Sequence, residues 1–203
     1  MSLFVKVCGI TDEFSARVAE RSGVDAIGFV FADSPRMVLP AVAGRIAGTV
    51  SDSILKVAVF RRPTQREIDE VLVAFEPDVV QADADSPIVL PAGIGFLPVF
   101  REGGISIDPT GSGRDRLVLY EGATSGVGLR VDWGVAARLA GEVRLVLAGG
   151  LNVGNVGEAI RTVRPFGVDV SSGVEVSPGI KDPTLISAFV ATARSSAELL
   201  EVT

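Results

Sequence analysis

The sequence predicts an α/β fold, a compact (βα)8 barrel that forms one domain over residues 1–203. Eight short apolar runs rich in β-branched residues alternate with amphipathic stretches, which is typical of parallel strands joined by helices. Glycine-rich and polar residues follow these runs repeatedly, at the face where such a barrel builds its site. The chain of 203 residues also lies near the lower limit of about 200 for a complete barrel.

The expected strands are apolar on both faces, as parallel strands covered by helices must be. They span Leu3–Val7, Ala26–Phe31, Ile54–Phe60, Val79–Gln81, Ile94–Val99, Leu117–Tyr120, Val143–Leu147 and Val168–Val170. Periodicity alone does not distinguish a closed barrel from an open, doubly wound sheet. No G-x-G-x-x-G motif follows the first run, which argues against a dinucleotide-binding sheet.

Helix boundaries are marked by capping residues. Thr64 and Glu67 have capping-box spacing ahead of the clearest amphipathic helix. Further N-caps are expected at Thr11, Asp132, Asn152 and Asp182. Residues 84–93 contain two prolines, and residues 101–116 contain four glycines and one proline. The helices of the fourth and fifth βα units are therefore expected to be short or irregular.

Composition excludes several classes of function. The net charge is −6 with Lys and Arg scattered singly, so no basic stripe is present to bind nucleic acid. The start of the chain lacks the pattern of a signal peptide, and no apolar run approaches the ~20 residues that span a bilayer, so we expect a cytoplasmic protein without a membrane partner. The single cysteine precludes an internal disulfide, and the absence of histidine excludes Ser-His-Asp, Cys-His and His-zinc sites. Proton chemistry must use Cys, Asp, Glu, Tyr or Lys.

Two loops near the C-terminus are candidates for a phosphate site. They follow the seventh and eighth strands and contain Gly149, Gly150, Asn152, Ser171, Ser172 and Gly173. Glycines expose backbone N–H groups, and a helix N-terminus adds positive potential, so a phosphate dianion is held without lysine. The alternative is two ordinary glycine-rich turns.

Four residues in the first, second and eighth βα units are candidates for chemistry or binding. Cys8 ends the first strand just before a helix, a location that favours a thiolate base, although a lone cysteine is more often a small buried apolar residue. Arg36 follows the second strand and is either a bidentate ligand for a carboxylate or a solvated surface residue. Lys6 and Asp169 lie in apolar strands, where an unpaired charge is costly, so they pair with each other or with substrate.

Acidic residues and a flexible loop complete the set of candidates. The fourth strand ends at Gln81 and is followed by Asp83 and Asp85, which are general acids or solvated caps. The segment 120–132 contains three glycines and suits a loop that closes over a ligand, or is a passive connection.

Taken together, these segments resemble the phosphoribosylanthranilate isomerase family of tryptophan biosynthesis, nearly from end to end. The most specific matches are Val5–Thr11, Gly28–Phe31 with Ser34–Arg36, Ala148–Asn152, Val168–Glu175 and Pro178–Asp182. The resemblance implies an isomerase that performs the Amadori rearrangement of N-(5-phosphoribosyl)anthranilate to 1-(2-carboxyphenylamino)-1-deoxyribulose 5-phosphate. It implies no metal and no organic cofactor. We expect a small phosphorylated substrate as the partner, and a protein that is a monomer or a homodimer.

The resemblance also assigns roles to residues. Cys8 matches the family's general base, Arg36 matches the arginine that holds the anthranilate carboxylate, and the glycine and serine loops match its phosphate site. We place Lys6, Gln81, Asp83 and Asp169 among the substrate-binding residues. An acid protonates the ribose ring oxygen and opens the ring to a Schiff base. The base then removes the C2′ proton, and the enolamine becomes the ketone.

The sequence departs from the family where the general acid is expected. The family has an aspartate at the end of strand six, whereas this strand ends at Tyr120 and Glu121, so either Glu121 or Tyr120 replaces it or nothing does. The Gln-Leu-His-Gly of strand four is also replaced, by residues 81–84, so Asp83 and Asp85 are further candidates for the acid. Glu121 is preferred because it keeps a carboxylic acid at the cost of one methylene. The alternatives for function are a related barrel acting on another phosphoribosyl or amino-sugar phosphate, or a phosphate-binding barrel without catalysis.

Overall fold

The computed structural model describes residues 3–105, 115–123 and 130–201, which form a closed parallel barrel. Its strands are β1 (Phe4–Cys8), β2 (Ala26–Val30), β3 (Leu55–Val59), β4 (Val79–Asp83), β5 (Gly95–Arg101), β6 (Leu117–Glu121), β7 (Arg144–Leu147) and β8 (Gly167–Val170). Each strand pairs with its neighbours in chain order, and β8 closes the barrel on β1 with Lys6 opposite Asp169. The predicted (βα)8 barrel is confirmed.

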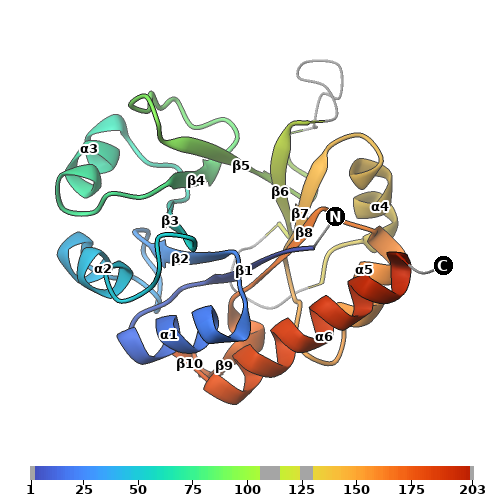
Figure 1. Ribbon diagram of the computed structural model, residues 1–203. Helices are drawn as coiled ribbons and strands as arrows, with labels where there is room; N and C mark the ends of the chain where they lie inside the picture. The colour runs from blue at the N-terminus through green and yellow to red at the C-terminus, as the bar shows by residue number, and fades with distance from the viewer. Residues whose placement is uncertain (1–2, 106–114, 124–129, 202–203) are drawn as a thin grey trace.

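Helices surround most of the barrel (Figure 1). They are α1 (Glu13–Ser22), α2 (Pro40–Ala47), α3 (Gln65–Ala74), α4 (Trp133–Ala140), α5 (Val156–Val163) and α6 (Pro183–Glu201). A loop without a helix joins β4 to β5, and the described part of the β5–β6 connection contains no helix either, which confirms the irregularity predicted there. Within the described ranges, no helix is long and apolar enough to cross a membrane. Residues 106–114, and residues 124–129 of the loop expected to close over a ligand, lie outside the described residues.

Two apolar layers form because successive strand residues face opposite sides of the sheet. Outward-facing residues such as Val5, Ile27 and Phe29 pack against the helices in the main core. Inward-facing residues fill the barrel in two smaller clusters, with Val57 in one and Leu119 in the other. Polar residues replace apolar ones where the strands end, so the interior changes from a packed core to a site.

The predicted N-cap residue is observed at most of the helices for which one was predicted, and a different residue caps two of them. The capping box of Thr64 and Glu67 is present at α3. At α1 the N-cap is Asp12, whose carboxylate accepts the Ser15 backbone N–H at 2.8 Å, so the expectation for Thr11 was wrong. At α5 the N-cap is Asn155, because the Asn152 side chain accepts the Gly154 N–H at 2.8 Å within the preceding turn. In both cases two capping residue types lie close together, and the later one starts the helix.

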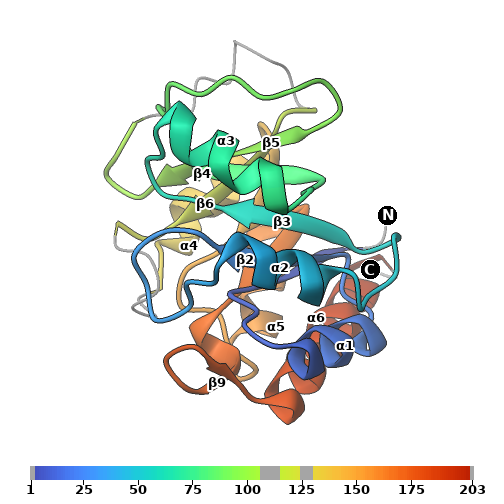
Figure 2. The same cartoon turned by 90° about the vertical axis from the view of Figure 1, so that its left-hand side faces the viewer.

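A short antiparallel hairpin after β8 was not predicted. A 3₁₀ turn (Ser172–Val174) leads into β9 (Glu175–Ser177), which pairs with β10 (Ile180–Lys181). Figure 2 shows β9 and the loop after β2 on the side of the molecule opposite the two termini. The hairpin turn packs closely on that loop, because a Cβ at Gly179 would overlap the carbonyl group of Pro35. The hairpin is therefore part of the wall around the carboxyl ends of the strands.

Candidate active site

A cavity of about 190 Å³ opens at the carboxyl ends of the strands. Six of the residues predicted from the sequence line it: Cys8, Arg36, Gln81, Glu121, Asp169 and Ser171. Arg61 and Arg101, which the sequence did not single out, lie on the same wall. The cavity thus gathers cationic, anionic and thiol side chains from βα units one to six and eight, as the active face of such a barrel requires.

An ion pair forms the floor of this cavity. Lys6 Nζ lies 2.9 Å from Asp169 Oδ1, and the two side chains are 0% and 8% exposed. The two residues pair with each other, which was one of the alternatives that the sequence left open. Burial lowers the pKa of Lys6, but attraction to Asp169 and Cys8 outweighs it and raises that pKa overall. The Asp169 carboxylate therefore favours the charged form of Lys6 beneath the cavity, while burial raises the pKa of Asp169 itself.

The Cys8 thiol lies directly above this pair. A Cβ at Gly28 would be 3.0 Å from Cys8 Sγ and 3.3 Å from Lys6 Cε, so the glycine leaves room for both side chains. Burial raises the pKa of Cys8, and the nearby Lys6 and Lys181 charges only partly oppose this effect. The expectation that the end of the first strand favours the thiolate was therefore wrong for the unliganded protein. The two lysines limit the cost of forming the thiolate, but they do not remove it.

Arg36 is held in a buried network of charges. Its Nε and Nη2 atoms each lie 2.8 Å from one carboxylate oxygen of Glu175. Lys181 Nζ lies 2.7 Å from the same carboxylate and 3.0 Å from the carbonyl oxygen of Ser171. Burial raises the pKa of Glu175, but hydrogen bonds from Arg36 and Lys181 outweigh it and lower that pKa overall. Arg36 is thus not a solvated surface residue. The Nε–Nη2 edge of its guanidinium group already binds the carboxylate of Glu175.

Backbone contacts fix the position of Arg36. Gly9 has φ 76°, and a Cβ there would lie 2.7 Å from Arg36 Cδ. Thr11 donates a hydrogen bond to the carbonyl oxygen of Gly179 at 3.0 Å, which ties the first βα loop to the hairpin. No role was predicted for Glu175 and Lys181 from the sequence. Pro178 and Gly179, which lie between them, form a pair typical of turns, and this pair could have predicted a hairpin that brings the two residues together.

Of the four candidates for an acid, Glu121 alone lines the cavity. Tyr120 faces outward and packs in the main core, where burial raises its pKa. Asp83 is buried behind Arg101, with its carboxylate 2.7 Å from Arg101 Nη2, and it lines a separate depression together with Asp85. The placement of Asp83 in contact with substrate is therefore not supported by the geometry.

Glu121 and Gln81 present polar groups of different kinds to the cavity. Glu121 is paired with Arg101, whose Nη1 atom lies 2.5 Å from its Oε1 atom. Gln81 is buried, and its Oε1 atom has no hydrogen-bond partner among the described residues. Because a buried carbonyl without a partner costs free energy, this atom is suited to accept a hydrogen bond from a ligand.

The two glycine-rich loops lie in contact beside the cavity. Gly149 and Gly150 have φ values of 86° and 65°, a conformation that favours glycine. A Cβ at Gly173 would overlap the carbonyl oxygen of Leu151, so the second loop lies directly on the first. Ser171 is the only member of the predicted phosphate set on the cavity wall. The others are Gly149, Gly150, Asn152, Ser172 and Gly173, and they lie outside the lining of the cavity.

Gly173→Ala is expected to lower the free energy of unfolding by about 1–3 kcal/mol, because the added methyl group forces the two loops apart. Urea denaturation measures the change. Gly48→Ala is the matched control, since a Cβ there would be 3.5 Å from its nearest neighbour, an ordinary contact. Equal stability of the two variants would show that the loops do not require this close approach.

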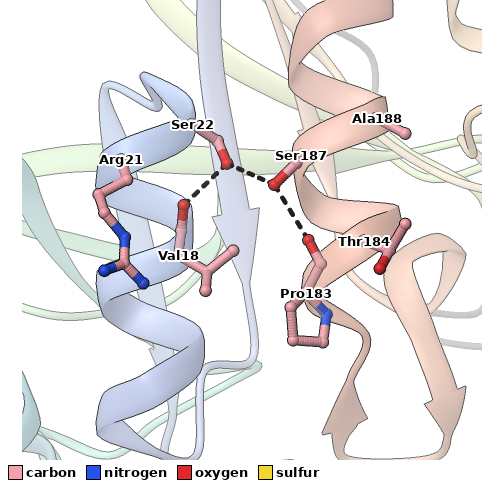
Figure 3. A pocket seen from close by; sticks show the side chains of 7 residues that line it. All are labelled: Val18, Arg21, Ser22, Pro183, Thr184, Ser187 and Ala188. Atoms are coloured by element: carbon pink, nitrogen blue, oxygen red, sulfur yellow. Dashed lines mark hydrogen bonds between the residues drawn. The ribbon is translucent and has the colours of Figure 1, made fainter.

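A second depression lies away from this face, between α1 and α6 (Figure 3). Two of its hydroxyl groups already have partners, since Ser22 Oγ and Ser187 Oγ lie 2.9 Å apart and each lies within hydrogen-bond distance of a helix carbonyl oxygen. Arg21 is the only ionisable residue that lines it. In the part of the chain that the structure describes, no three Cys, Asp or Glu residues are grouped as a metal site.

Comparison with known proteins agrees with this geometry. The family described as "PRAI: N-(5'phosphoribosyl)anthranilate (PRA) isomerase" matches residues 5–192. The N-(5'-phosphoribosyl)anthranilate isomerase of Bordetella petrii is 36% identical over 97% of this chain and 97% of its own. The crystal structure of phosphoribosyl anthranilate isomerase from Thermus thermophilus superposes with a TM-score of 0.80 at 28% identity, over 95% of this chain and 99% of that one.

A further similar structure contains a ligand. It is phosphoribosyl anthranilate isomerase in complex with reduced 1-(o-carboxyphenylamino)-1-deoxyribulose 5-phosphate, with a TM-score of 0.76, 30% identity and coverage of 95% of this chain and 99% of that one. The match in sequence extends over nearly the whole chain, and the match in structure includes the complete barrel. The chain therefore belongs to the N-(5'-phosphoribosyl)anthranilate isomerase family.

Proposed function

We infer that this protein is a phosphoribosylanthranilate isomerase, an aldose-ketose isomerase of tryptophan biosynthesis. The observation that carries this inference is the cavity at the carboxyl ends of the strands, which Cys8, Arg36 and Glu121 line together. The chain also matches the isomerase family over residues 5–192. A gene that encodes this chain should restore growth without tryptophan to a bacterium that lacks the isomerase. Growth that still requires tryptophan, with the protein present in the soluble extract, would contradict the inference.

The proposed chemistry consists of two proton transfers with protein groups, followed by a tautomerisation. An acid gives its proton to the ribose ring oxygen as the C1′–O bond breaks, which leaves a Schiff base. Cys8, as thiolate, then removes the proton from C2′, and the electron pair forms the enolamine. The enolamine then takes up a proton at C1′ and loses the proton of its C2′ hydroxyl group, which gives the ketone. Each transfer contributes roughly 10²- to 10⁴-fold to the rate. Lys6 and Lys181 support the base because their charges favour the thiolate.

Glu121 is the proposed acid, since it reaches the cavity and Tyr120, Asp83 and Asp85 do not. Glu121→Gln removes the proton but keeps the shape of the side chain, and it is expected to lower kcat at least ~100-fold. Asp83→Asn is expected to retain much more activity. Steady-state kinetics of the two purified variants give the ranking, and a larger loss in Asp83→Asn would assign the acid to the fourth strand.

Arg36 is proposed to bind the aromatic carboxylate of the substrate. Its Nε and Nη2 atoms bind Glu175, which fixes the plane of the guanidinium group, and the Nη1 edge is proposed to receive the ligand. Arg36→Ala is expected to raise KM about 10- to 100-fold with a smaller change in kcat, as for the loss of a charged hydrogen bond. Arg45→Ala, on the exposed face of α2, is the control. An unchanged KM in Arg36→Ala would place the carboxylate elsewhere.

The remaining contacts follow from the loops and from Gln81. Gly149, Gly150, Ser172 and Gly173 are proposed to hold the phosphate through backbone N–H groups. Gln81 is proposed to bind a ribose hydroxyl through its Oε1 atom. Ser171 is hydrogen-bonded to Lys181, and it joins the phosphate loop to the Arg36 network. Asn152 shapes the first loop through its bond to Gly154.

We propose that the protein works in the cytoplasm as a monomer or a homodimer. A buried, unpaired Cys8 is consistent with a reducing compartment. Light scattering of the eluted protein distinguishes the two assembly states, and a larger assembly would contradict both.

A further inference from the structure

Glu121 belongs to a chain of charges that crosses three neighbouring strands. Asp83 ends β4, Arg101 ends β5 and Glu121 ends β6. Arg101 lies directly opposite Glu121 in the strand register. The Arg101 guanidinium touches both carboxylates, through Nη1 to Glu121 at 2.5 Å and through Nη2 to Asp83 at 2.7 Å. A single cation therefore bridges the proposed acid and a second carboxylate.

The two carboxylates differ in their surroundings. Glu121 lies on the cavity wall, whereas Asp83 lies behind Arg101 and is only 4% exposed. Asp83 accepts two hydrogen bonds from Arg101 on Oδ1, at 2.7 and 3.1 Å, and one from Arg62 on Oδ2 at 3.2 Å. Asp83 therefore accepts from Nε and Nη2 of Arg101, and Glu121 lies at Nη1.

The sharing of Arg101 by two carboxylates affects Glu121, because the proposed acid must carry a proton that it can give up. A guanidinium next to a carboxyl group favours its charged form, which cannot act as an acid. A second carboxylate on the same guanidinium acts in the opposite direction, because it compensates the positive charge and repels a negative charge on Glu121. Asp83 is close enough to Arg101 for this effect, and it is buried enough that solvent screens it little.

We propose that Arg101 and Asp83 are positioning residues for the acid: Arg101 holds Glu121 at the cavity wall, and Asp83 compensates the Arg101 charge so that Glu121 keeps its proton for the reaction. This proposal rests on Glu121 being the acid of the proposed function. It explains why Asp83 lies buried next to the site without reaching the cavity, and it gives Arg101 a role that the sequence did not indicate.

Titration of Glu121 in the unliganded protein tests the electrostatic part without any use of activity. The side-chain carboxyl ¹³C signal of Glu121, assigned by its disappearance in Glu121→Gln, is followed against pH in wild type, Asp83→Asn and Arg101→Gln. In Asp83→Asn the uncompensated Arg101 should lower the apparent pKa of Glu121 by about one unit, a tenfold smaller protonated fraction above that pKa. In Arg101→Gln the pKa should rise.

Two controls make the titration specific. Asp85→Asn removes a carboxylate of the same cluster that is paired with Arg62 at 3.0 Å, so it should leave the Glu121 titration unchanged. Arg101→Lys keeps the charge and should move the titration back toward wild type. Thermal unfolding shows whether each variant is folded. The same Glu121 titration in wild type, Asp83→Asn and Arg101→Gln would overturn the proposal.

The pH dependence of kcat/KM then separates this proposal from the proposed function. An acid must be protonated, so kcat/KM stops rising with pH once the pH passes the pKa of the acid, and this break should move to lower pH in Asp83→Asn and to higher pH in Arg101→Gln. A shifted titration with an unmoved break would overturn the catalytic role of the network. A wild-type protein without isomerase activity would refute the proposed function, while the titration would still decide whether Asp83 and Arg101 control Glu121.

Discussion

Cys8→Ser is expected to lower kcat by about 10²- to 10⁴-fold. The base is the deprotonated side chain, and a serine hydroxyl is too weakly acidic to lose its proton and take over this role. The change nearly keeps the size of a side chain that packs against Gly28, where an added Cβ would lie 3.0 Å from Cys8 Sγ. The fold should therefore be retained. Steady-state kinetics with the natural substrate measure the loss, and near-normal turnover would reject Cys8 as the base.

The same variant gives a second, pH-dependent result. Burial raises the pKa of Cys8, so the thiolate is a minor form at neutral pH and its fraction increases as the pH rises. The wild-type kcat/KM should consequently rise with pH as the thiolate fraction grows, until the acid begins to lose its proton. In Cys8→Ser this rise should be absent. An identical rise in both proteins would assign it to another group.

Lys6→Met is expected to lower the free energy of unfolding by about 3–5 kcal/mol, since it leaves Asp169 buried without its partner. The Nζ–Oδ1 pair at 2.9 Å closes the barrel between β1 and β8, and neither side chain is more than 8% exposed. Urea denaturation monitored by the single tryptophan measures the change. Arg66→Met is the control, because Arg66 and Glu70 form an exposed pair on α3 worth about 0.5 kcal/mol or less.

A double variant shows whether the loss comes from the pair. Lys6→Met with Asp169→Asn removes both charges and should be more stable than the sum of the two single effects predicts, because no uncompensated charge remains. Strict additivity would contradict the ion-pair explanation. The double variant should remain inactive, since the Lys6 charge that supports the Cys8 thiolate is lost.

Local signals in the sequence predicted most of the barrel. Each of these signals affects only the few residues around it, so its effect on the structure can be predicted from the sequence. Examples are the eight apolar runs, the capping box at Thr64 and the prolines in residues 84–93. The pairing of Lys6 with Asp169 was one of two alternatives because few other charges occur in apolar strands. The choice between Thr11 and Asp12 as a cap depended on the hairpin contact of Thr11 with Gly179, which lies 168 residues away.

The parts of the site that were not predicted depend on strand length and on register. The expected fifth strand ended at Val99, whereas β5 extends to Arg101 and so turns that side chain into the barrel mouth. The bridge from Arg101 to Asp83 and Glu121 follows from the register of three strands, which no local pattern specifies. The network of Arg36, Glu175 and Lys181 required the hairpin to fold back on the loop after β2.

The most direct test of the central claim uses the substrate itself. Phosphoribosylanthranilate is generated in place, because it is labile, and the loss of its anthranilate fluorescence is followed with wild type and with Cys8→Ser. Rapid loss is expected with wild type, and a rate close to that of the uncatalysed reaction is expected with Cys8→Ser. No loss above the uncatalysed rate with folded wild-type protein would contradict the assignment as an isomerase.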